Sequence, residues 1–187
     1  ARVPRHPAWF DYAFDSASHS IQEGSVRISS GNYRFSGTLQ ARAPMALAVQ
    51  VDGTAQAPVP SRPTPLQLTA HATVNGTLAG LGAALDLVAQ LAPQLPAASL
   101  APRASVQARI TPWQSQPVAH ANAHWQNLDL AALWPQAPHT QLSGTASVTP
   151  QAAAWAAAVT LDNTQSGPWD QQRLPIEHLQ TTLSYDI

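Results

Sequence analysis

One stretch of strict alternation constrains the fold of this chain more than any other feature. Between residues 66 and 78, LQLTAHATVNGTL, every second residue is apolar or glycine and every residue between them is polar. A period of two is typical of a β-strand, because successive side chains point to opposite faces of a sheet. The stretch therefore predicts a strand with one apolar face and one polar face.

The pair Asn75-Gly76 within this stretch would ordinarily indicate a two-residue hairpin turn. A hairpin would place Val74 and Thr77 opposite each other on one face and would turn Leu78 to the other face. A continuous strand keeps Val74, Gly76 and Leu78 together and points Thr77 toward water. Because only the continuous strand separates apolar from polar side chains, we predict that the strand runs through Gly76.

The same alternation, with a glycine on the apolar side followed by threonine, recurs in three other segments. These segments are YRFSGTLQA at 33–41, VQVDGTAQA at 49–57 and LSGTASV at 142–148. A glycine inside a strand marks a bend, a bulge or the close approach of another group. Two interpretations are open: the glycines relieve a crowded or bent core, or they leave a gap on an apolar surface that a ligand chain could occupy.

Composition limits the class of protein. The 187 residues are enough for one domain with a sizeable core. Only 10% of the residues are charged and the formal net charge is -1, so nothing indicates a nucleic-acid-binding surface. The lack of cysteine excludes a disulfide scaffold, a thiol nucleophile and a zinc site with cysteine ligands.

The two ends of the chain indicate a piece of something longer. The sequence starts at Ala1 without a signal peptide and contains no apolar run long enough to span a membrane. It ends inside a strand-like pattern, LQTTLSYDI. We therefore expect residues 1–187 to be a single β-segment of a longer protein.

Prolines separate the alternating segments. Eleven of the 17 prolines lie at 58–65, 93–102, 112–117 and 135–138, where they predict loops between strands. Alternation predicts strands at 25–28, 33–42, 45–57, 66–78, 103–111, 118–125, 142–149, 155–161 and 179–187. A turn near Ser30-Gly31-Asn32 is expected to join the first two strands, and 163–173 is expected to be a loop. Residues 1–15 are expected to form a first strand or an ordered lead-in.

Two segments are compatible with a helix. The segment LGAALDLVAQLAPQL at 81–95 fits both helical and strand spacing. Its alanines and leucines favour a helix, whereas the flanking strands, Gly82 and Pro93 favour a return strand, which is our prediction. The segment DLAALW at 129–134 predicts a short helix with Asp129 as its N-cap and Pro135 as its stop.

These elements predict an all-β protein with roughly ten to twelve strands, mostly antiparallel because the connections are short. No long amphipathic helix is available to cover the apolar face. The sheet must therefore curl on itself or face a second sheet. A barrel or sandwich would hide the apolar face, whereas a curled and open sheet would form an apolar trough that needs a lipid or a partner.

The sequence contains no recognisable catalytic constellation. It lacks the HExxH, GxSxG, Walker and GxGxxG motifs, and its acidic residues are scattered, so we predict neither enzymatic activity nor a cofactor. His120 and His124 have the spacing of a helical metal pair, but in a strand they would lie about 13 Å apart, so we predict no metal site. The six tryptophans are expected to plug the ends of the sheet or anchor loops, with contacts to a partner or a membrane interface as the alternative.

From residue 112 onward the sequence resembles the TamB family of AsmA-like proteins. The resemblance is carried by PWQSQPVAHANAHWQNLDLAALWPQAPHTQLSG at 112–144, VTP at 148–150, the tryptophan at 155 and LDNTQSGPWDQQRLPIEHL at 161–179. It extends more loosely over 20–111. The resemblance implies a long curled β-sheet with a taco-like apolar trough, and no catalytic residues.

The same resemblance implies a place and partners for the chain. It implies an internal segment of a periplasm-spanning protein that is anchored in the inner membrane of a Gram-negative, β-proteobacterial cell. It further implies that other parts of the full-length protein bind an outer-membrane barrel of the TamA type. No nucleic-acid partner and no membrane span are expected in this segment.

Three functions follow from these expectations. The first is a conduit that carries phospholipids between the two membranes and supports outer-membrane protein assembly. The second is a scaffold that binds unfolded outer-membrane or autotransporter polypeptides by strand addition. The third is an inert β-sandwich spacer. For a conduit, the expected contacts of the acyl chains are the apolar-face residues Leu47, Val49, Val51, Leu66, Leu68, Val74, Leu78, Val106, Ile110, Val148, Val159, Leu161 and Leu183.

Overall fold

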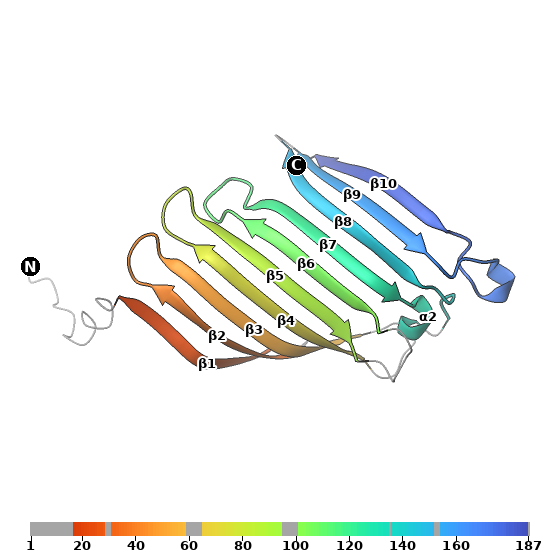
Figure 1. Cartoon of the computed structure of the whole chain (residues 1–187), viewed down its shortest axis with the longest axis horizontal. Helices are drawn as coiled ribbons and strands as arrows, with labels where there is room; N and C mark the ends of the chain where they lie inside the picture. The colour runs from red at the N-terminus through yellow and green to blue at the C-terminus, as the bar shows by residue number, and fades with distance from the viewer. Residues whose placement is uncertain are drawn as a thin grey trace, which may run out of the picture.

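A computed structural model of the chain describes residues 17–28, 31–58, 65–94, 101–134, 136–151 and 154–186. Ten strands follow one another in a single antiparallel sheet, and each strand pairs with its neighbours in the chain (Figure 1). The strands are β1 (Ser18–Ile28), β2 (Gly31–Gln40), β3 (Ala46–Ala57), β4 (Leu66–Thr77), β5 (Ala84–Pro93), β6 (Arg103–Ile110), β7 (Val118–Leu128), β8 (Leu142–Gln151), β9 (Ala154–Asn163) and β10 (His178–Asp186). The all-β prediction is confirmed, and the sheet is not closed into a barrel.

The alternation of apolar and polar residues located these strands, although β1 begins at Ser18, seven residues before the predicted start at 25. Strand β4 runs through Gly76, which pairs with Leu47 on one side and with Leu85 on the other, so the hairpin interpretation of Asn75-Gly76 is excluded. The ambiguous segment at 81–95 contains β5, which pairs with β4 and β6 along its length. The segment forms a strand in spite of its helical propensity because both neighbouring strands offer it hydrogen-bond partners.

The structure corrects two details of the loops. Gly31 and Asn32 are not turn residues; they belong to β2 and pair with Ile28 and Arg27. The expected loop at 163–173 contains a short 3-10 helix, η1 (Trp169–Gln171). Cross-strand pairing extends β2 into the residues that the sequence indicated as a turn. In the loop at 163–173, three residues form a tight helical turn. The expected first strand or lead-in at 1–15 lies outside the described residues.

The one predicted helix is present. Helix α2 (Leu130–Leu133) connects β7 to β8, and Asp129 is its N-cap. The Asp129 carboxylate accepts hydrogen bonds from the backbone N–H groups of Ala131 and Thr140, each at 3.0 Å. The buried Thr140 hydroxyl accepts a hydrogen bond from the backbone N–H of Leu130 at 2.9 Å. These bonds join the residues just before β8 to the start of α2.

We expect the Asp129→Ala substitution to destabilise the chain by about 1–2 kcal/mol, because it leaves two backbone donors without their acceptor. Asp129→Asn is the matched control, since an amide oxygen can still accept at this position. Urea unfolding of the three proteins measures the effect. Equal midpoints for Asp129→Ala and wild type would show that the cap contributes nothing.

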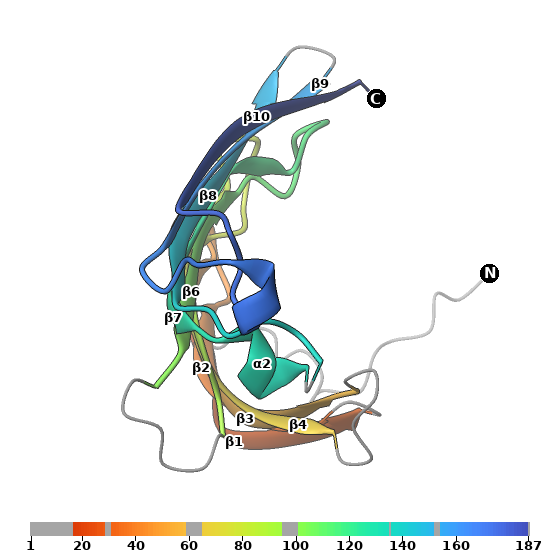
Figure 2. The same cartoon turned by 90° about the vertical axis from the view of Figure 1, so that its right-hand side faces the viewer.

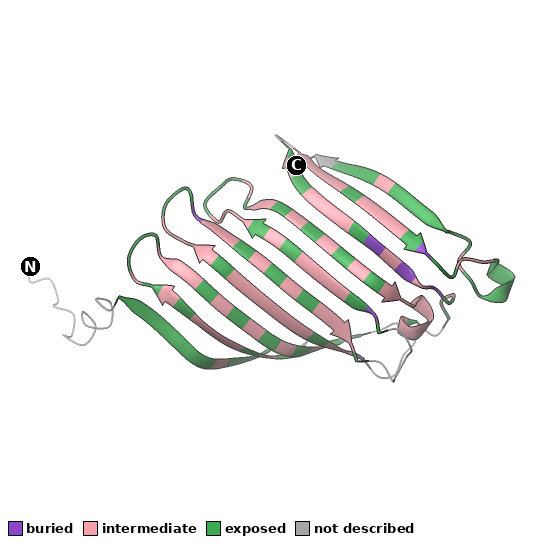
Figure 3. Ribbon diagram, viewed as in Figure 1, coloured by how far each residue is buried: buried purple, intermediate pink, exposed green. Residues whose placement is uncertain are grey.

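The sheet is curved rather than flat. Figure 2 shows it bent like the letter C, with α2 and η1 inside the curve. The buried residues in the described part of the chain are few, namely Leu66, Ala83, Pro102, Thr140, Leu142, Gly144 and Asn163. Most residues of the sheet are half-buried or exposed in an alternating pattern (Figure 3). The described residues therefore form an open sheet without a sealed core.

Candidate functional site

The strand register joins the apolar side chains into continuous rows across the sheet. Residues paired directly in an antiparallel ladder lie on the same face. One row crosses all ten strands as Ile21, Gly37, Val49, Val74, Leu87, Ala108, Ala121, Val148, Ala157 and Leu183. A second row is Gly24, Phe35, Val51, Ala72, Ala89, Val106, Ala123, Ala146, Val159 and Thr181. Across these two rows, Thr181 is the one polar residue.

The apolar face is less exposed than the polar face. In β7 the small residues Ala121 and Ala123 are half-buried, whereas the larger Asn122 and His124 between them are exposed. We call this apolar face, defined by the two rows above and their neighbours on the same side, the trough.

Aromatic rings fill the spaces above several glycines of the trough. A Cβ atom added to Gly144 would meet the ring of Trp125 at 2.6 Å, and one added to Gly24 or Gly53 would meet the ring of Phe35 or Tyr33. Each ring lies on a neighbouring strand that pairs with its glycine. These glycines therefore accommodate close packing within the sheet, and the interpretation of a vacant gap is not supported at these positions.

Two loops are hydrogen-bonded to each other at one end of the strands. The indole N–H of Trp113, in the β6–β7 connection, donates to the backbone carbonyl of Leu78 at 2.6 Å. The side-chain amide of Gln114 in the same connection donates to the carbonyl of Leu81 at 3.0 Å. This connection is thus anchored to the β4–β5 connection, which confirms for Trp113 the expected role of a loop anchor.

The structure places the predicted lining residues on one face. Twelve of them lie on the apolar side of their strands, at register positions shared with the trough: Leu47, Val49, Val51, Leu66, Leu68, Val74, Val106, Ile110, Val148, Val159, Leu161 and Leu183. Leu78 follows the end of β4 and is half-buried in the connection to β5. Whether any of them touches a lipid remains a prediction.

Sequence reasoning left several trough residues out of that set. The rings of Tyr33, Phe35 and Trp125 and the side chains of Leu85, Leu87 and Leu91 lie on the same face by register. The alternation that identified the others marks these too. The three leucines were left out because the segment at 81–95 also fitted a helix, in which they would not lie on one face.

The opposite, polar face carries pairs of charged side chains on neighbouring strands. The His71 ring nitrogen Nδ1 lies 2.6 Å from an Asp52 carboxylate oxygen, and Arg109 donates to Asp86 at 3.0 Å. His178 Nδ1 lies 2.7 Å from Asp162 at the other end of the sheet. All six side chains are exposed, so solvent screens each pair and each contributes little to stability.

Hydrogen bonds from His71 and then Gln50 hold the pKa of Asp52 below its ordinary value, and slight desolvation opposes them. A depressed carboxyl pKa stabilises the fold above the pKa of the unfolded chain, and this stabilisation is lost as pH falls through the folded pKa. We therefore expect Asp52→Asn to lower the Tm slightly at pH 6 and to have no effect near pH 2, well below about 3.9.

Thermal unfolding at the two pH values measures this difference. Asp170→Asn, at an exposed residue of η1, is the matched control for loss of one surface carboxylate. A Tm difference for Asp52→Asn that is the same at both pH values would contradict the assignment.

The polar face offers no metal centre in the part of the chain that the structure describes. No group of three or more His, Cys, Asp or Glu side chains there could hold a metal ion. His120 and His124 lie opposite Arg109 and Ser105 of β6, as expected for residues on one strand face. The polar face also has a hollow that extends over β3 to β7.

The fold and its trough define the class of this chain: an open, curved antiparallel β-sheet with one continuous apolar face. No family model, curated protein or solved structure matches the chain. Neither helix in the described residues is long and apolar enough to cross a membrane.

Proposed function

We propose that this chain is a lipid-conducting segment whose trough carries phospholipid acyl chains. The observation that supports this most is the size of the uncovered apolar face. Ten strands about 4.8 Å apart and about 33 Å long give the face an area on the order of 1,000 Å². Soluble monomers rarely expose apolar patches beyond a few hundred Å², and larger ones mark sites for ligands, membranes or other proteins.

The dimensions of the trough suit acyl chains. The hydrocarbon core of a bilayer is about 30 Å thick, so one leaflet contributes about half of that length. A trough roughly 43 Å across its ten strands can therefore hold a whole acyl chain. Each buried CH₂ group contributes about 0.8 kcal/mol without directional contacts, so binding would be additive and would not require a dedicated head-group site.

In the proposed setting, the chain belongs to a TamB-like protein that spans the periplasm between an inner-membrane anchor and an outer-membrane barrel partner. Its trough would conduct phospholipids between the two membranes and support outer-membrane protein assembly. This setting rests on the sequence resemblance over 112–187, and the chain acts in it as a conduit rather than as an enzyme.

Lipid extraction and native mass spectrometry of the chain, purified without detergent, test the proposal. The expected result is co-purified phospholipid with more than one acyl composition, since the contacts are non-directional. A chain that carries no phospholipid after exposure to vesicles would overturn the proposal.

A second function is favoured by the two sheet edges. Among the described residues, β1 pairs only with β2 and β10 pairs only with β9. Both edge strands expose large apolar side chains. These are Ile21 and Val26 on β1 and Leu179 and Leu183 on β10, and the Leu183 side chain is 59% exposed. An unpaired strand edge with this character can bind an extended polypeptide by strand addition. Photocrosslinks from Ser184 to an unfolded outer-membrane protein, without lipid in the trough, would favour this scaffold function.

A further inference from the structure

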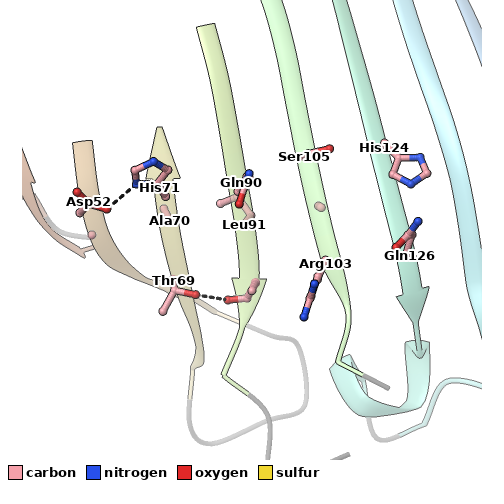
Figure 4. A pocket seen from close by; sticks show the side chains of 13 residues that line it. Asp52, Thr69, Ala70, His71, Gln90, Leu91, Arg103, Ser105, His124 and Gln126 are labelled. Carbon is pink, nitrogen blue, oxygen red and sulfur yellow. Dashed lines mark hydrogen bonds and ion pairs between the residues drawn. The ribbon is translucent and has the colours of Figure 1, made fainter. Parts of the chain in front are cut away.

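A hollow lies over the polar face of the sheet, where its polar side chains alternate along the strands with the residues of the trough. It has a volume of about 600 Å³ and extends over β3 to β7 (Figure 4). That volume falls within the range of about 300–1,000 Å³ typical of small-molecule sites. Small-molecule sites are usually lined by apolar side chains with a few polar groups. Eight of the thirteen residues that line this hollow are polar or charged and the other five are glycine or apolar, so the hollow offers many hydrogen-bonding groups to a polar occupant.

The register explains why a hollow forms there. One polar row runs directly across these strands as Asp52, His71, Gln90, Ser105 and His124. The next row includes Ala92 on β5 and the pair Arg103 and Gln126 on β6 and β7. Small side chains at Ala92 and Ser105 form the floor, and longer side chains on the outer strands form the rim.

The charges of the hollow are unequal at its two ends. At the β3–β4 end the Asp52 carboxylate is already engaged by His71 at 2.6 Å. At the β6–β7 end, Arg103 and His124 form no ion pair with any described residue. An uncompensated guanidinium on a polar surface is suited to a carboxylate or a phosphate, which it can bind through two parallel hydrogen bonds.

The remaining lining groups are suited to hydroxyl groups. Gln90 and Gln126 each offer a carbonyl acceptor and two N–H donors, and Ser105 offers a hydroxyl. A sugar hydroxyl both donates and accepts, so it can pair with either end of a side-chain amide. We propose that this hollow binds a sugar that carries a carboxylate or a phosphate group, with the anionic group at Arg103 and the ring over Gln90 and Ser105.

Isothermal titration calorimetry on the whole chain tests this inference with four probes: glucuronate, glucose 6-phosphate, glucose and inorganic phosphate. The two acidic sugars distinguish a carboxylate from a phosphate, and the other two probes separate the ring from the charge. We expect at least one acidic sugar to bind about tenfold more tightly than glucose and inorganic phosphate, since both ends of the site contribute.

The variant Arg103→Gln is expected to weaken that binding by about tenfold or more, the loss typical of a charge-assisted hydrogen bond. Arg109→Gln is the matched control, because Arg109 lies on the same face of β6 but is held by Asp86 at 3.0 Å. Its affinity should stay within about twofold of wild type. Both arginines are exposed, and circular dichroism checks that both variants fold.

Three results would overturn the inference. They are no heat of binding for either acidic sugar, equal affinities of wild type and Arg103→Gln, and inorganic phosphate binding as tightly as glucose 6-phosphate. Because the hollow and the trough lie on opposite faces, none of these results depends on whether the trough carries lipid.

Discussion

The Val49→Asp variant is expected to lose bound phospholipid while remaining folded. Val49 lies on the apolar face of β3, between Gly37 of β2 and Val74 of β4, and it is half-buried. In an empty, open trough an aspartate there can keep its water. When an acyl chain covers the position, the carboxylate must lose that water without gaining a partner, which costs several kcal/mol.

The expected effect is at least a tenfold loss of co-purified lipid, since about 1.4 kcal/mol already corresponds to a factor of ten. Lipid extraction and native mass spectrometry of the variant measure the loss. A variant at Leu68, Leu68→Asp, should behave in the same way, because Leu68 lies on the same face of β4 and pairs with Ala55 and Pro93.

The sheet offers a matched control for charge and strand propensity. Val88 is a valine on the polar face of β5, where it pairs with Thr73 and Gln107 and is 39% exposed. Val88→Asp introduces the same change on the other side of the sheet, with the same loss of strand propensity of up to about 1 kcal/mol. It is expected to retain wild-type lipid.

Two outcomes would contradict the conduit. If Val49→Asp unfolds while Val88→Asp remains folded, the apolar face is a closed core rather than an open trough. If all variants keep their lipid, the lipid is bound elsewhere on the chain. Circular dichroism before the lipid measurement separates the first outcome from a genuine loss of binding.

The second large effect is expected from Gly144→Ala, which should destabilise the chain by about 2–3 kcal/mol through overpacking. Gly144 is buried in β8. A Cβ atom there would meet the backbone oxygen of Thr160 on β9 and the Trp125 ring at 2.6 Å on β7. The indole can rotate away, but the backbone oxygen belongs to a paired strand and cannot move without disturbing the ladder.

For a chain of this length, that loss corresponds to a Tm lower by roughly 4–12 °C. Gly82→Ala is the matched control, because a Cβ atom at Gly82 would have no atom within 4 Å. Differential scanning calorimetry of both variants makes the comparison. Equal Tm values for the two variants would show that the close packing around Gly144 does not constrain the sheet.

The same variant separates the two interpretations of the strand glycines. If Gly144 relieves crowding, Gly144→Ala loses stability and the folded fraction keeps its lipid. If the glycine instead leaves room for a ligand, the variant stays stable and binds less lipid. The position of the Trp125 ring supports the first result.

Much of the secondary structure could be predicted from the sequence because the face on which a strand residue lies is a local property. A period of two assigns each residue to a face without knowledge of its neighbours in space. The phase of Val74, Gly76 and Leu78 alone was enough to exclude a hairpin in β4. The N-cap at Asp129 was equally local, because its acceptor lies two residues from its donor at Ala131.

The candidate sites depended on tertiary structure to different degrees. Twelve of the thirteen predicted trough residues lie in strands on the expected face, because burial follows the same local period. The polar hollow had no local signal. It brings together Arg103 and Asp52, which are far apart in the sequence, only because the two strands between them, β4 and β5, pair in one register with β3 and β6.

By itself, the sequence determined which segments are strands and which side of each strand is apolar, since both follow from the alternation along the backbone. Only the tertiary structure decided that the ten strands form one open sheet rather than a barrel or two packed sheets. The physical reason is that closure depends on whether the first and last strands meet. That meeting is set by the twist and curvature accumulated over all ten strands, which no single segment encodes.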